Sequence, residues 1–235
     1  MPESYTDSPL LGSHFDDALL LATSHHRRQL RKGTKIPYTA HLLAVAGLVL
    51  EMGGSEDEAI GALLHDLVED GGGPAGLADI RSRFGDDVAR IVLANSDTDE
   101  EPKPPWEARK RAYIAAIAHK QPDELRVSLA DKLHNARAIL LDYRTHGEAL
   151  WARFKAGEGP AVRWYYRSLL EAFESRREAL GSAAEPALCE LARTVAELER
   201  LAGAQNGSSS SSSSSSSSLG DQAGRDMPGA SSPTA

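Results

Sequence analysis

Apolar residues recur along most of this chain with the spacing of an α-helix. The segment 15–31, for example, is periodic, with Leu19, Leu20 and Ala22 apolar. We predict helices over 15–31, 37–52, 77–84, 86–94, 106–119 and 122–143, and around 146–154, 160–180 and 184–202. No segment alternates as a half-buried strand would, and no internal repeat is visible. The pattern therefore predicts an all-α fold, a compact multi-helix bundle.

Local signals mark where several of these helices begin and end. Pro37 lies at the favoured first turn of its helix. Ser55 and Glu58 form a capping-box pattern that opens a helix carrying His65 and Asp66. Gly85 separates two shorter helices. Residues 95–105 form a polar, proline-rich loop long enough to cover a site.

The composition changes near residue 204, where a Gly- and Ser-rich stretch with an unbroken run of serines begins. Such a segment cannot bury a core, so we expect 204–235 to be disordered. We expect a flexible N-terminus over 1–13 and one domain over 14–203.

Charge and cysteine content limit the classes of function. The formal net charge is −8, which argues against the broad basic surface that DNA or RNA binding demands. Cys189 is the sole cysteine, so no intramolecular disulfide can form and a reducing cytoplasm is expected. The longest apolar stretch is too short to span a membrane, and the start lacks an apolar signal core. Oligomeric state stays open.

Four titratable residues lie within six positions after an apolar run: His65, Asp66, Glu69 and Asp70. In one continuous helix, His65 and Glu69, and likewise Asp66 and Asp70, stand one turn apart and all four share about a quadrant of its surface. No cation is nearby in the sequence to balance the three carboxylates. A divalent metal ion is the natural counter-charge.

Two further candidates stand alone in apolar helical runs, His41 and Asp131. Taken singly, a buried histidine is more often a hydrogen-bonded core residue, and a lone aspartate is more often solvated or capping. Taken together, several buried charges without a partner would be very costly. The order His, His-Asp, Asp from three helices therefore indicates a metal site for Mn²⁺, Fe²⁺ or Zn²⁺.

This order of residues resembles the HD superfamily of metal-dependent phosphohydrolases. With the segment 31–38, Phe84–Gly85 and the segment 129–135, it resembles more closely the hydrolase domain of RelA/SpoT-type alarmone enzymes. The resemblance covers residues 14–175 and suggests a stand-alone small alarmone hydrolase, because no synthetase domain is present.

The resemblance implies roles for particular residues. It implies metal ligation, usually of Mn²⁺, by His41, His65, Asp66 and Asp131. It implies that the acidic pair Glu69 and Asp70 orients or deprotonates the attacking water. It implies nucleotide contacts by Arg31, Lys32, Tyr38 and Asn135. The implied reaction removes pyrophosphate from the 3′ position of guanosine tetra- or pentaphosphate.

Two local clusters supply cations for a phosphorylated ligand. Arg27, Arg28, Arg31, Lys32 and Lys35 form the first, and Lys103, Arg109, Lys110 and Arg111 form the second. From the second cluster we expect Lys103 and Arg109 to bind phosphate, although a solvated helix face is the plain alternative. A local basic patch on an acidic chain fits a small phosphorylated nucleotide better than a nucleic acid.

Two departures from the family pattern leave the base of the substrate open. Ser128 stands where the family often has lysine, and 94–99 differs from the usual motif. Guanine and adenine alarmones are both possible substrates. A nucleotidase or phosphatase of the same superfamily is the alternative enzyme. An antitoxin that binds an alarmone-synthesising toxin is the alternative of another class.

Overall fold

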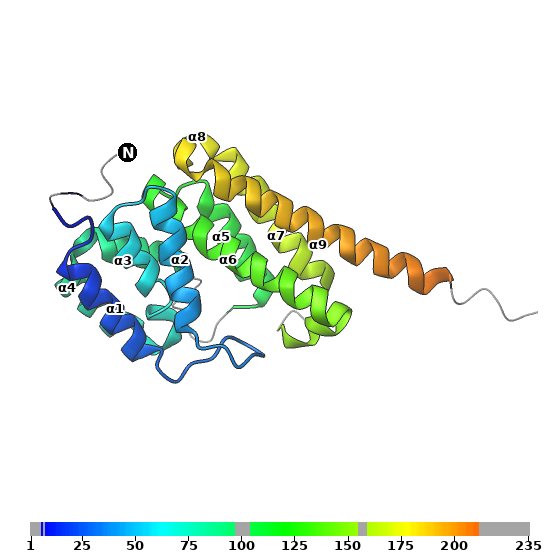
Figure 1. Cartoon of the computed structure of the whole chain (residues 1–235), viewed down its shortest axis with the longest axis horizontal. Helices are drawn as coiled ribbons and strands as arrows, with labels where there is room; N and C mark the ends of the chain where they lie inside the picture. The colour runs from blue at the N-terminus through cyan, green and yellow to red at the C-terminus, as the bar shows by residue number, and fades with distance from the viewer. Residues whose placement is uncertain (1–5, 7, 97–103, 155–158, 212–235) are drawn as a thin grey trace, which may run out of the picture.

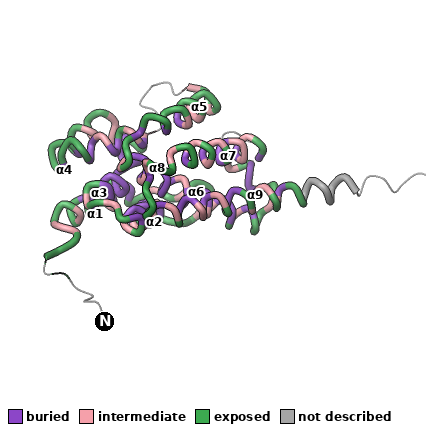
Figure 2. Tube along the Cα trace, turned by 90° about the horizontal axis from the view of Figure 1, so that it is seen from above, coloured by how far each residue is buried: buried purple, intermediate pink, exposed green. Residues whose placement is uncertain are grey.

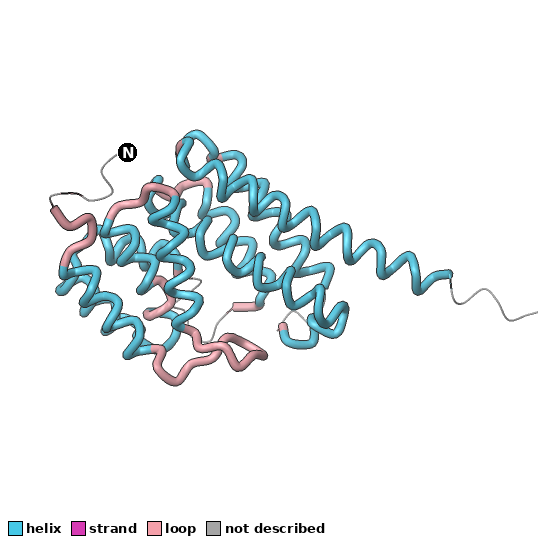
Figure 3. The backbone as a smooth tube through the Cα atoms, viewed as in Figure 1, coloured by secondary structure: helices cyan, strands magenta, loops and turns pink. Residues whose placement is uncertain are grey.

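The computed structural model describes residue 6 and the ranges 8–96, 104–154 and 159–211, with side chains as far as residue 204. Helices make up most of these ranges, and no β-strand occurs in them (Figure 3). The α-helices are α1 Ser13–His25, α2 Thr39–Glu51, α3 Glu56–Leu64, α4 Gly73–Asn95, α5 Trp106–Ile117, α6 Pro122–His146, α7 Gly159–Ser175, α8 Arg177–Leu180 and α9 Glu185–Ser211. Short turns of other helix types cover Val68–Gly72, Gly147–Arg153 and Ser182–Ala184. The all-α prediction is confirmed.

Helix α6 lies at the centre of the bundle. It packs against α2, α3 and α4, and also against α7 and α9 (Figure 1). Helix α9 runs beside α6 and then extends past the rest of the bundle (Figure 1). Helix α6 therefore contacts both the early and the late parts of the chain.

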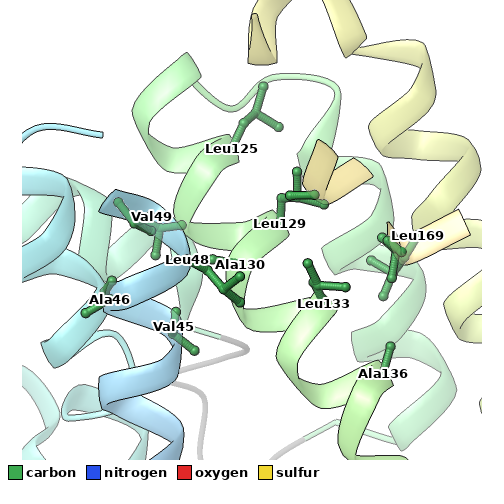
Figure 4. Close-up of a cluster of buried hydrophobic side chains, with 14 of the residues drawn as sticks. Val45, Ala46, Leu48, Val49, Leu125, Leu129, Ala130, Leu133, Ala136 and Leu169 are labelled. Carbon is green, nitrogen blue, oxygen red and sulfur yellow. The ribbon is translucent and has the colours of Figure 1, made fainter. Parts of the chain in front are cut away.

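The core lies between these helices, and Figure 2 marks in purple the buried positions along them. Figure 4 shows Val45 and Val49 of α2, Leu129 and Leu133 of α6, and Leu169 of α7 within one apolar cluster. Burying such side chains stabilises the fold by roughly 1.5–3 kcal/mol each. Two of these helices, α2 and α6, also carry His41 and Asp131, so the same packing brings those residues together.

Sequence signals explain the start of α3. The Ser55 Oγ accepts a hydrogen bond from the Glu58 amide at 3.3 Å, and the Glu58 carboxylate accepts one from the Ser55 amide at 2.6 Å. The predicted capping box is therefore present. Glu58 also accepts a hydrogen bond from Arg126 Nε at 2.6 Å, which ties the start of α3 to α6.

Some helix boundaries differ from the expected ones. Helix α1 ends at His25 instead of residue 31, because the chain then folds back in an isolated antiparallel bridge between Leu30 and Pro37. Helix α4 runs through the expected break, which survives as a single non-helical residue, Gly85, at φ 92°. Helix α9 continues to Ser211, so it crosses the boundary expected at 204, and residues 212–235 lie outside the described ranges. Among the described residues, no helix has both the length and the apolar character needed to cross a membrane.

Candidate metal centre and adjoining cavity

Three helix segments bring four of the expected metal ligands together. His41 comes from α2, the pair His65–Asp66 follows the end of α3, and Asp131 comes from α6. Ligand atoms of His41, His65 and Asp66 all lie within 4.8 Å of one another. Asp131 Oδ1 lies 3.3 Å from His41 Nε2 and 3.8 Å from His65 Nε2. Two imidazoles and two carboxylates therefore meet at one point, as the ligands of a borderline divalent metal would.

The His65 ring is oriented as a metal ligand should be. Its Nδ1–H donates to the Ala62 carbonyl at 2.7 Å, which leaves Nε2 as an acceptor. Nε2 is buried and has no hydrogen-bond partner among the described residues, although it lies 3.0 Å from Asp66 Oδ2. A buried polar atom without a partner is rare and costly, and a cation between the imidazole and the carboxylate would satisfy it. The residues therefore fit a metal ion.

His134 bonds to Nδ1 of His41, as the Ala62 carbonyl does to Nδ1 of His65. The two Nδ1 atoms are 2.8 Å apart, so one ring must donate its proton to the other. Burial, together with the neighbouring His41, lowers the pKa of His134 to about 4. His134 is therefore neutral at pH 7 and can accept the His41 Nδ1–H, which leaves His41 Nε2 free to bind a metal ion.

The cluster attracts positive charge. Burial alone would raise the pKa of Asp131, but the adjacent Lys132 ammonium and both imidazoles outweigh it and hold that pKa well below its usual range. Lys132 Nζ donates to Asp131 Oδ2 at 2.5 Å. Burial would likewise lower the pKa of His65, but the Asp66 carboxylate raises it to about 9. A site that raises the proton affinity of a buried imidazole in this way also favours a cation.

Hydrogen bonds extend from the cluster toward the loop 26–38. Tyr38 Oη donates to Asp66 Oδ2 at 2.5 Å. Asn135 donates to Asp131 Oδ1 at 2.5 Å, and Arg31 in turn donates to Asn135 Oδ1 at 2.9 Å. Three residues of the expected nucleotide-binding set, Tyr38, Asn135 and Arg31, are thus linked to the metal centre.

A cavity of about 310 Å³ opens beside this network. Four of the expected substrate-binding residues line it: Arg31, Lys32, Tyr38 and Asn135. Apolar side chains provide much of the remaining lining, including Ile36, Ile139, Leu150 and Phe154. Ligand pockets of this size are typically apolar with a few polar groups, so the cavity suits a nucleoside.

The acidic pair that follows the metal ligands departs from a single helix. Helix α3 ends at Leu64, and Val68–Gly72 forms a wider π-helical turn that closes with the Gly72 amide bonded to the Leu67 carbonyl. Within that turn Asp70 has non-helical angles and Gly71 lies at φ 110°. The expectation that all four titratable residues share one helix was therefore wrong, because the glycines after Asp70 let the chain unwind.

The side chain of Asp70 consequently turns toward α1 and the residues after it. Gln29 Nε2 donates to Asp70 Oδ2 at 2.7 Å, and Gln29 Oε1 in turn accepts from His26 Nδ1 at 2.5 Å. His26 is buried and stacks on Tyr38. This His26–Gln29–Asp70 chain was missed in the sequence, because its members are polar residues without a metal-ligand pattern.

The described members of the second basic cluster, Arg109, Lys110 and Arg111, lie on α5 and do not line the cavity. Burial, with the neighbouring Lys132 and Arg109, lowers the pKa of Lys110 to about 7, while Glu69 and Asp131 oppose that shift. Lys110 of α5 is therefore close to the charges of the centre. Arg109 does not line the cavity, and its Nε donates to the Pro104 carbonyl at 3.2 Å. Lys103, also expected to bind phosphate, lies outside the described residues.

The chain is similar to known proteins in both sequence and structure. A family model for the HD domain matches residues 18–159. A guanosine-3′,5′-bis(diphosphate) 3′-pyrophosphohydrolase of Xenopus tropicalis is 39% identical over 132 residues, which are 53% of this chain and 71% of that protein. The human protein of the same name is 36% identical over 126 residues, which are 52% of this chain and 68% of its own length.

A solved structure is also similar. It belongs to a metazoan ortholog of SpoT that is described as hydrolysing ppGpp and acting in starvation responses. It superimposes with a TM-score of 0.61 at 25% identity and covers 80% of this chain and 97% of its own. The likeness therefore extends over most of the described helices.

Proposed function

Because the chain belongs to the HD domain family, we propose that it is a metal-dependent hydrolase that removes the 3′-pyrophosphate from guanosine tetra- or pentaphosphate. One observation carries this proposal: a buried cluster of two histidines and two aspartates is hydrogen-bonded through Tyr38 and Asn135 to the wall of a nucleoside-sized cavity. The 3′-pyrophosphohydrolases that resemble the chain support the same reaction. GDP or GTP and pyrophosphate are the products.

We propose that His41, His65, Asp66 and Asp131 hold the metal ion and that the ion is Mn²⁺. Bound there, a divalent cation would polarise a phosphoryl oxygen and lower the pKa of a water molecule. His134 and the Ala62 carbonyl orient the two imidazoles, and Tyr38 and Asn135 orient the two carboxylates. These outer contacts keep the four ligands preorganised.

We assign proton transfer to the acidic pair. A water oxygen attacks the phosphorus attached to the 3′-oxygen, and Glu69 accepts the proton that the water loses. The bond between that phosphorus and the 3′-oxygen breaks, and the 3′-oxygen takes a proton from bulk water and leaves as the 3′-hydroxyl of the nucleotide. Asp70, held by Gln29, helps to orient the water. Phosphoryl transfer needs little more than such positioning and charge neutralisation.

We place the nucleoside in the cavity and assign its phosphates to the two basic clusters. Arg31 and Lys32 are at the cavity wall, and Asn135 is near the ribose. Arg109 and Lys103 are assigned to phosphate from the second cluster. The net charge of −8 makes such local cations the means of attracting a polyanion. The single cysteine leads us to propose the cytoplasm as the compartment.

The decisive experiment is incubation of the purified protein with guanosine 3′,5′-bis(diphosphate) and Mn²⁺. We expect metal-dependent release of GDP and pyrophosphate, resolved by anion exchange, and a loss of at least about 100-fold in Asp66→Ala. Asp86→Ala, which changes an exposed aspartate on α4, should keep full activity. Release of inorganic phosphate alone, or equal turnover by Asp66→Ala, would overturn the proposal. Circular dichroism verifies that each variant is folded.

A further inference from the structure

The cavity holds one carboxylate that the proposed reaction does not use. Asp142 lies on its wall, and Arg153 Nη1 donates to Asp142 Oδ2 at 3.3 Å. Resting on the proposed function, we propose that Asp142, held by Arg153, binds the Watson–Crick edge of guanine. This contact makes the site select guanosine substrates over adenosine substrates.

The position of Asp142 follows from the geometry of α6. Asn135, Ala138, Ile139 and Asp142 all line the cavity, at spacings of three, four and seven residues along one face of the helix. Asn135 is bonded to the metal-site residue Asp131. Seven residues of helix rise by about 10 Å, which is about the length of a nucleoside from its ribose to the far edge of its base. Asp142 therefore stands where the base edge would lie when the 3′-phosphate is at the metal centre.

The cavity wall between Asn135 and Asp142 suits a flat base ring. Ala138, Ile139, Leu150 and Phe154 supply apolar surface beside the polar residues. Apolar and aromatic contacts of this kind bind any purine without choosing between bases. Discrimination must therefore come from a polar group at the base edge.

The carboxylate and its partner are held in place. The Asp142 side chain is 34% exposed and that of Arg153 is 27% exposed, so both can meet a ligand. A Cβ on Gly33 would lie 2.7 Å from Arg153 Cδ, and Gly33 itself adopts φ +71°. The stem of Arg153 thus packs closely against the loop that carries Arg31 and Lys32. This contact fixes the direction from which the guanidinium approaches Asp142.

Hydrogen-bond chemistry selects the base. An ionised carboxylate only accepts hydrogen bonds, and its two oxygens match two adjacent donors. Guanine presents such a pair, the N1–H and the N2 amino group. Adenine presents one donor, the N6 amino group, beside the bare acceptor N1. A site built to bond a substrate N–H discriminates strongly against the analogue that lacks it.

The test is calorimetric binding of GDP, IDP and ADP to the full-length protein and to Asp142→Asn. This substitution keeps the shape of the side chain but replaces one acceptor by a donor. For the wild type we expect GDP to bind about 10- to 100-fold more tightly than ADP, with IDP, which lacks the N2 amine, between them. In Asp142→Asn we expect the ratio of GDP to ADP affinity to fall to near one, mainly through weaker GDP binding. Asp86→Asn, an exposed aspartate also paired with an arginine, should leave the ratio unchanged.

The inference is overturned if the wild type does not prefer GDP, or if Asp142→Asn weakens GDP and ADP alike. Failure of the proposed function gives a different result. In that case the preference for GDP and its loss in Asp142→Asn would remain, while guanosine 3′,5′-bis(diphosphate) would release no pyrophosphate. Conversely, equal rates of pyrophosphate release from guanosine and adenosine substrates would refute the role of Asp142 and leave the proposed hydrolase activity intact.

Discussion

At the scale of single residues, the centre depends on which nitrogen of each imidazole carries a proton. His65 has its tautomer set by a backbone carbonyl, whereas His41 has it set by another side chain, His134. A backbone acceptor cannot be removed by substitution, but a side-chain acceptor can. His41 is therefore the ligand whose orientation is open to a test.

We expect His134→Ala to weaken Mn²⁺ binding by about 10-fold or more, because His41 then loses the acceptor that keeps its Nε2 unprotonated. Calorimetric titration with Mn²⁺ measures the affinity. Turnover should recover at saturating Mn²⁺, since the proposed reaction assigns His134 only to the orientation of His41. His119→Ala, which removes an exposed histidine, is the control. Unchanged affinity in His134→Ala would show that the ring of His41 is oriented by packing alone.

Residue patterns indicated which side chains meet at the cluster, but they did not indicate the contacts that support those side chains. His41, His65, Asp66 and Asp131 form a spaced motif, and the structure brings all four together. His134 and Lys132 lie within three positions of Asp131, but the sequence carries no signal that His134 contacts His41 or that Lys132 contacts Asp131. Which residue a helical side chain contacts depends on the neighbouring helix that packs against it, and the local sequence does not specify that neighbour.

At the scale of helices, close packing of α3 on α4 sets the position of His65. Gly61 lies one turn before His65, and a Cβ there would come within 2.6 Å of Ile91 Cγ2 on α4. Gly47, in α2, has no heavy atom within 4 Å of such a Cβ. The two glycines are therefore a matched pair, one required by packing and one not.

We expect Gly61→Ala to lower the free energy of unfolding by about 1–3 kcal/mol, because α3 and α4 must move apart. Gly47→Ala should instead raise it by up to about 1 kcal/mol, because alanine favours the helix and meets no neighbour. Urea denaturation of both variants measures the difference. Equal effects of the two substitutions would contradict the close contact between α3 and α4.

Helix boundaries were predicted where a local interaction decides them. The capping box of Ser55 and Glu58 was found, as was the break at Gly85. The end of α3 was not, because a periodic apolar pattern continues past Leu64 through Leu67 and Val68. Leu67 and Val68 are buried in the structure. An apolar pattern would bury them equally well in a continued α-helix, so it does not distinguish that helix from a π-helical turn.

At the scale of the whole molecule, a buried lysine and a half-buried arginine join the ends of several helices. Lys120 is only 5% exposed, and its ammonium donates to the Ala94 carbonyl at the end of α4. Arg176 donates to the carbonyls of Ile117 at 2.9 Å and Lys120 at 3.0 Å, after α7. These contacts satisfy carbonyls at helix ends, which lack a partner within the helix, and join α4, α5 and α7.

Stability should depend on pH through Lys120. Burial lowers the pKa of Lys120 to about 8 in the folded protein, below the usual value of 10.5. Between these values the unfolded chain binds more protons, so the contribution of Lys120 to stability rises with pH and is lowest below pH 8. Relative to Lys120→Met, the wild type should gain about 3 kcal/mol in free energy of unfolding from pH 7.5 to 10.5.

Urea denaturation at several pH values tests this expectation, with Lys35→Met, an exposed lysine, as the control. A parallel pH dependence of the wild type and Lys120→Met would show that Lys120 keeps its proton in the folded protein.

The sequence by itself determined the helical class, the identity of the four metal-ligand candidates and the family resemblance. Each follows from residue type and spacing, which are properties of the chain before it folds. Only the tertiary structure decided that Asp70 turns to Gln29, that His134 supports His41, and that Asp142 and Arg153 share a cavity wall with Arg31. These pairs join different helices and loops, so their contacts arise from packing between elements, and packing is fixed only when the whole core assembles.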